Sequence, residues 1–115
     1  LARLPKSQIR AMYPGGAATE LPLRTEVGPD SIKALTDLLA LELSAGFSEE
    51  HGMIMPETSS VAVAATNHLG LPVAAFVVTF RTEAMQADRV KDLVGIMASR
   101  LKPTAAELSR RLGSK

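Results

Sequence analysis

Two apolar runs near the middle of the chain form its clearest pattern of hydrophobic and polar positions. Residues 60–67, SVAVAATN, and 71–80, LPVAAFVVTF, are each as long as a strand and rich in valine, and a turn signal around Gly70 separates them. Two such runs around a connection that contains glycine predict an antiparallel hairpin. We expect residues 59–80 to form a buried β-hairpin in the middle of a central sheet.

The side chains of the two predicted strands alternate between small and bulky residues. One phase comprises Ser60, Ala62, Ala64, Ala75, Val77 and Thr79, and the other comprises Val61, Val63, Phe76, Val78 and Phe80. Successive side chains of a strand point to opposite faces, so the bulky phase predicts a face that packs against a helix. The small face has two interpretations that the pattern does not separate. It either allows close packing of a covering segment or leaves a cavity in which hydroxyls hold a polar ligand.

Helical periodicity flanks the strands. Residues 5–13 predict a short helix, and leucines at three- and four-residue steps predict a second helix from Asp30 or Ser31 to Ala45, where Gly46 is a natural stop. Residues 47–50 predict a short strand. From Gln86 the pattern is helical as far as Gly113, with a kink or a break expected near Pro103 because proline removes a helical hydrogen bond.

Composition narrows the possible classes of function. The chain has 115 residues, which fits one domain, and its 13 basic and 12 acidic residues give a net charge of +1. That balance provides no electrostatic footprint for DNA or an anionic membrane, and an aromatic content of 3% is too low for a nucleic-acid stacking platform. The longest uncharged apolar stretch, residues 69–80, is too short to span a bilayer. No signal peptide is recognisable, so a soluble cytoplasmic protein is expected.

No catalytic set is recognisable in the sequence. Adjacent carboxylates at Glu49 and Glu50 point to opposite faces of a strand and cannot share a substrate, and Ser59 lacks the glycine elbow of a nucleophile. His51 and His68 are the only histidines, and a metal site would need both or a distant carboxylate. The absence of cysteine excludes a thiol nucleophile. We therefore expect no enzyme activity, no metal and no cofactor.

Four stretches of the chain resemble, in order and spacing, the motifs of one known family. Residues 1–13 are similar to its "LA-x-LP" turn and helix, and residues 25–47 to its threonine, leucine-rich helix and G-Y/F pair. Residues 70–75 are similar to its "G-x-V/P-V/I-A-A" strand, and residues 106–113 to its last helix. The chain thus resembles, over its whole length, the effector-binding domain of IclR-type transcriptional regulators.

This resemblance implies a GAF-like α/β (α+β) fold and the sensor half of a transcription factor. In that family the domain binds a small-molecule effector, often a carboxylic or aromatic acid, and the regulators assemble as dimers or tetramers. Contact with DNA is made by an N-terminal winged-helix domain, which this chain lacks. Residues 1–115 are expected to be a single, partial effector-binding domain that begins after the early strands of the full domain.

The resemblance also implies four ligand-binding residues. The family's polar residue after the G-Y/F pair corresponds to Glu50, the residue that opens its central strand to Ser60, and its two alternating serines to Val77 and Thr79. Val77 lacks the hydroxyl, which favours a more apolar ligand or none. The alternative is therefore an oligomerisation or protein-interaction module with a vestigial pocket. Arg81 could reach a ligand carboxylate, although an exposed arginine at the end of a strand is the preferred interpretation.

Overall fold

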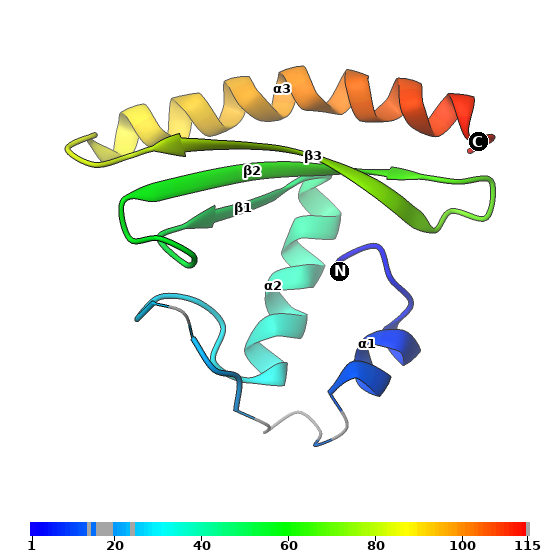
Figure 1. The fold of residues 1–115 in the computed structure, drawn as a ribbon, viewed down its shortest axis with the longest axis horizontal. Helices are drawn as coiled ribbons and strands as arrows, with labels where there is room; N and C mark the ends of the chain where they lie inside the picture. The colour runs from blue at the N-terminus through cyan, green and yellow to red at the C-terminus, as the bar shows by residue number, and fades with distance from the viewer. Residues whose placement is uncertain (14, 16–19, 24, 115) are drawn as a thin grey trace.

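The computed structural model of the chain describes residues 1–13, 15, 20–23 and 25–114. A three-stranded antiparallel sheet separates helix α3 on one side from helices α1 and α2 on the other (Figure 1). The elements are, in chain order, α1 (Lys6–Met12), α2 (Ile32–Ala45), β1 (Ser48–His51), β2 (Thr58–Thr66), β3 (Pro72–Arg81) and α3 (Ala87–Arg111). The α+β class and the central antiparallel sheet predicted from the sequence are confirmed.

The predicted hairpin is formed by β2 and β3, and its two strands differ in position. The strand order is β1-β2-β3, so β2 lies in the centre and β3 at an edge. The turn is fixed by the Asn67 side chain, whose Oδ1 accepts the N–H groups of Leu69 and Leu71, and by Gly70 at φ +75°. β2 alternates between buried and half-buried residues, whereas most residues of β3 are exposed. The prediction of a wholly buried hairpin is therefore wrong for β3, because only one side of that strand has a neighbour.

Helix α2 has the ends that the sequence predicts. Ser31 precedes it in an extended conformation, and its Oγ accepts the N–H of Ala34 at 3.1 Å. Gly46 ends it in the left-handed region at φ +80°, which a residue with a side chain rarely adopts. Strand β1 begins at Ser48, two residues after Gly46, and Ser48 Oγ donates a hydrogen bond back to Glu42 Oε2 in the helix.

Helix α3 is one continuous helix of 25 residues, so the break expected near Pro103 does not occur. Proline removes only its own N–H, and Pro103 and Ser99, whose carbonyl that N–H would have bonded, are both exposed. On the opposite side, Val94, Ala98 and Ala105 remain buried on both sides of the proline. Packing against the sheet thus holds the helix together through Pro103. None of the helices in the described part of the chain has the length and apolar character of a membrane span.

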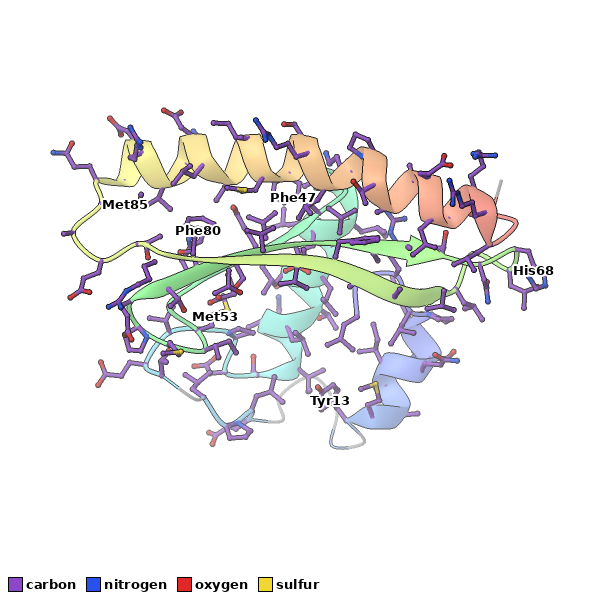
Figure 2. The ribbon with its side chains drawn as sticks, turned by 45° about the horizontal axis from the view of Figure 1, so that its top comes forward. Tyr13, Phe47, Met53, His68, Phe80 and Met85 are labelled. Carbon is purple, nitrogen blue, oxygen red and sulfur yellow. The ribbon has the colours of Figure 1, made fainter. Side chains whose placement is uncertain are left out.

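Two apolar clusters hold the layers together. One lies between α3 and the bulky face of the sheet, where Val61, Val94 and Ala98 are buried with Phe47 and Phe80 packed around them (Figure 2). The other joins α1 to α2 through Ile9, Leu35 and Leu39. The bulky face therefore packs against a helix as predicted.

Candidate functional site

A row of three polar residues crosses the small face of the sheet. Glu50 in β1 pairs with Ser60 in β2, and Ser60 pairs with Thr79 in β3. Directly paired residues share a face, so all three side chains lie on the face opposite α3. Val77 lies two residues from Thr79 in β3, on the same face and opposite Ala62. The structure thus brings the four predicted residues together on one face, and we call them the sheet row. Their role in ligand binding remains a prediction.

The hydroxyls of the sheet row bond to each other. Ser60 Oγ and Thr79 Oγ1 lie 2.9 Å apart, and either oxygen can donate. Each hydroxyl can make one bond as a donor and two as an acceptor, so the pair keeps capacity for a ligand. Val77 contributes no polar atom, and its side chain is 58% exposed. Along β3, Thr79 therefore has the apolar Val77 on one side and Arg81 on the other.

The two carboxylate oxygens of Glu50 differ in their hydrogen bonding. Its Oε2 accepts the N–H of Met53 at 3.0 Å, whereas Oε1 is buried and has no hydrogen-bond partner among the described residues. A buried acceptor without a partner costs about 1–3 kcal/mol, and more when it is charged. Oε1 is therefore a position where a hydrogen-bond donor would be stabilising.

The segment before α2 borders the Glu50 end of the sheet row. Thr25 Oγ1 donates to the carbonyl of Gly52 at 2.5 Å, which ties this segment to the turn between β1 and β2. Met53 from the same turn lies next to Gly28, where a Cβ would be 3.5 Å from the Met53 Cγ. Figure 2 shows Met53 below the sheet, on the side away from α3. Glu50 is half-buried and is bonded to this turn through the N–H of Met53, whereas Thr79 is exposed in the edge strand.

The small face is not closed into a cavity over the sheet row by the described residues. A hollow of about 60 Å³ adjoins the row at Ser48 and Ala62, far below the roughly 300–1,000 Å³ of most ligand pockets. Arg81 lies beyond Thr79 on the same face and is the cation of β3. Its Nη2 contacts Glu83 Oε2 at 2.8 Å, but both side chains are largely exposed, so this pair costs little to open.

A second polar network lies on the bulky face, and the sequence analysis did not predict it. His51 Nδ1 lies 2.8 Å from Ser59 Oγ, and His51 Nε2 lies 3.4 Å from Glu49 Oε2. These residue types also form serine-hydrolase triads, but Ser59 is only 1% exposed and its Oγ also contacts Thr82 Oγ1 at 3.4 Å. A nucleophile has to reach its substrate, so this geometry satisfies a buried hydroxyl and supports no acyl transfer. The pairing of His51 with Ser59 depends on the register between β1 and β2, which no sequence signal gives.

The two histidines lie far apart. His68 is in the turn between β2 and β3, at the opposite end of the hairpin from β1 and His51 (Figures 1 and 2). Within the described ranges, no three potential ligands gather at one place. Near the C-terminus, Arg110 and Arg111 both donate to Glu107, and these hydrogen bonds lower the pKa of the Glu107 carboxyl. This part of α3 is a solvated charged surface.

Comparison with known proteins gives a result at the level of three-dimensional structure. No protein-family profile and no curated protein sequence matches the chain. Among solved structures, the Thermotoga maritima IclR superposes with a TM-score of 0.83 at 20% identity, over 97% of this chain and 42% of that one. The C-terminal domain of the Escherichia coli transcriptional regulator KdgR gives 0.77 at 21% identity, over 98% of this chain and 65% of that one.

The chain has the fold of the effector domain of IclR-type regulators. A third structure with this fold is a double mutant of the inducer-binding domain of the PobR transcription factor from Acinetobacter, in complex with 3-hydroxybenzoic acid. Its TM-score is 0.64 at 22% identity, over 94% of this chain and 58% of that one. The solved structures named here are regulators, not enzymes. The predicted resemblance to the IclR-type effector domain is confirmed for the fold.

The chain spans only part of the solved proteins that share its IclR-type fold. It covers 42% of the Thermotoga maritima protein and 65% of the KdgR C-terminal domain. About a third of a domain with the same fold thus has no counterpart in these 115 residues. In the structure, the sheet row is most exposed where it reaches the edge strand β3.

Proposed function

We propose that the chain is part of the ligand-sensing effector domain of an IclR-type transcriptional regulator. A small metabolite lies over Ser60, Val77 and Thr79, with Glu50 at the rim. DNA is contacted by a winged-helix domain outside these residues, in a homodimer or homotetramer. The observation that carries the proposal is the sheet row itself: one register places all four residues on one face, and the buried Oε1 of Glu50 lacks a partner among the described residues.

The chemistry of the sheet row favours an organic acid that also has a hydroxyl group. The ligand hydroxyl donates to Glu50 Oε1, which accepts no other described donor. A ligand carboxylate at about 4 Å from Glu50 would be repelled by about 1–4 kcal/mol, so the acid group lies at the far end of the row. Arg81 is on that end of the same face, and its exposed contact with Glu83 is easily exchanged. The 3-hydroxybenzoic acid bound by the PobR domain belongs to this chemical class.

The signal follows from differential affinity. A ligand that binds one subunit arrangement more tightly than another shifts the population toward it, and the spacing of the DNA-binding domains changes with it. The sheet row is suited to this, because β1, β2 and β3 each contribute one of its polar residues. Tilting the strands against one another would change the distances between these polar side chains.

A thermal-shift screen of the complete protein tests this function. The panel pairs each hydroxy acid with its deoxy analogue, such as 3-hydroxybenzoate with benzoate and lactate with propionate. A ligand at 100 times its Kd adds about 2.7 kcal/mol to the free energy of unfolding, and the hydroxy acid should stabilise more. Thr79→Val should weaken binding about tenfold without lowering the melting temperature of the unliganded protein. The control, Thr104→Val at an exposed position of α3, should leave binding unchanged. Unchanged affinity in Thr79→Val would remove Thr79 from the site.

The interaction module is the second candidate, and one observation favours it. Strand β3 is an edge strand, and its Val73 and Val77 side chains are 54% and 58% exposed. An exposed apolar edge strand is a template for pairing with another strand. If no compound of the panel shifts the melting temperature of the complete protein, the sheet row is vestigial and this candidate replaces the first.

A further inference from the structure

A second hollow lies away from the sheet row, between α1 and α2. It has a volume of about 660 Å³, within the usual range for small-molecule sites. Its floor is apolar, with buried Ile9 from α1 and buried Ile32 and Leu39 from α2. The two helices lie side by side below the sheet in Figure 1 and are joined by the apolar cluster around Ile9. We call this hollow the α1–α2 groove.

The rim of the α1–α2 groove is positively charged. Lys6 and Arg10 line it, four residues apart on one face of α1, and neither forms an ion pair within the described ranges. Asp37 is the acidic residue of the lining, but it is already bonded to Lys33 at 2.9 Å. That hydrogen bond and the charge of Asp37 raise the pKa of Lys33. Two cations and one carboxylate thus give the lining a net charge of +1 beside an apolar floor.

We infer that the α1–α2 groove binds an amphipathic organic anion. The apolar body of the ligand lies on Ile9, Ile32 and Leu39, and its carboxylate lies between Lys6 and Arg10. The charge pattern is opposite to that of the sheet row, where Glu50 repels an acid group. Binding would fasten α1 to α2, and the groove lies on the side of the sheet away from α3 (Figure 1).

Methyl NMR of the complete protein with labelled isoleucine δ1 groups tests this site, with octanoate as the probe. The isoleucines of this chain are Ile9, Ile32, Ile54 and Ile96. The Ile9 and Ile32 signals should shift and saturate with a Kd at or below about 1 mM, while those of Ile54 and Ile96 stay in place. Octanol, which lacks the charge, should bind about three- to tenfold more weakly, and octylamine more weakly still.

Charge-neutralising variants give the decisive comparison. Lys6→Gln with Arg10→Gln should lower octanoate affinity about three- to tenfold and leave octanol affinity unchanged. The control, Arg89→Gln with Arg100→Gln, removes the same charge from exposed positions of α3 and should change neither. An unshifted Ile9 signal in the unliganded variant shows that α1 still lies on α2. The inference is overturned if octanoate shifts Ile54 or Ile96 instead, fails to saturate, binds no better than octanol, or keeps its affinity in the Lys6/Arg10 variant.

Discussion

The two faces of the sheet are built from alternate residues of the same strands, yet the described residues cover them very differently. On the bulky face, α3 runs along β2 and buries Val61 completely. On the small face, the direct bond from α2 to the sheet is between Glu42 and Ser48, and the helix runs steeply away from it (Figure 1). One face therefore supplies the stability of the sheet, while the other keeps polar groups available. Substitutions at neighbouring positions should separate these two roles.

A matched pair of valines gives the largest expected contrast. Val61→Ala removes two methyl groups from a position with 0% exposure and should lower the free energy of unfolding by about 2 kcal/mol. Val77→Ala makes the same change on the small face, at 58% exposure, and should change it by less than about 0.5 kcal/mol. Urea denaturation of both variants measures the difference. If both variants lose the same free energy of unfolding, Val77 is as buried as Val61 in the folded protein, which would contradict an open small face.

The adjacent serines provide the next contrast. Ser59→Ala deletes a buried hydroxyl that holds His51 and should cost about 1 kcal/mol of stability. Ser60→Ala deletes a half-buried hydroxyl that, among the described residues, bonds to Thr79, and it should cost about 0.5 kcal/mol or less. If Ser60→Ala destabilises the unliganded protein more than Ser59→Ala, the hydroxyl pair is structural and the ligand role of the row fails.

The adjacent glutamates complete the series with the smallest effect on stability. Glu50→Gln replaces a carboxylate whose buried Oε1 has no described partner, and it should stabilise the unliganded protein by up to about 1 kcal/mol. The same variant should bind a hydroxy acid more weakly, because an amide accepts the ligand hydroxyl less strongly than a carboxylate. Glu49→Gln on the bulky face, where the side chain is half exposed, serves as the control and should change neither quantity. A stability loss in Glu50→Gln would show that Oε1 already has a donor.

Side-chain alternation explains how much of this arrangement the sequence could predict. Because a strand has a period of two, the residues of each face follow from the sequence once the strands are recognised, and Ser60, Val77 and Thr79 were assigned correctly to the small face. The edge position of β3 was not predictable in this way, because an apolar sequence does not indicate whether a strand pairs with one neighbouring strand or with two. The continuity of α3 through Pro103 depends on packing against β2, and the contact between His51 and Ser59 depends on register.

The candidate site likewise has features that the sequence predicted and features that depend on tertiary structure. The resemblance to IclR-type regulators supplied Glu50, which no residue pattern would have connected to a hairpin at 59–80. The buried oxygen of Glu50 and the cationic groove between α1 and α2 could not be predicted from the sequence, because both depend on what surrounds a side chain in the fold. Local patterns thus predicted which residues share the small face, and tertiary packing determined the charges around them.

Amide hydrogen exchange, with and without the compound that gives the largest thermal shift, tests the ligand role of the small face most directly. The account predicts added protection in β3 around Thr79 and in the turn around Gly52 that is bonded to Glu50, with no change in α3. Protection confined to α3, or none in β3 and this turn, would contradict it.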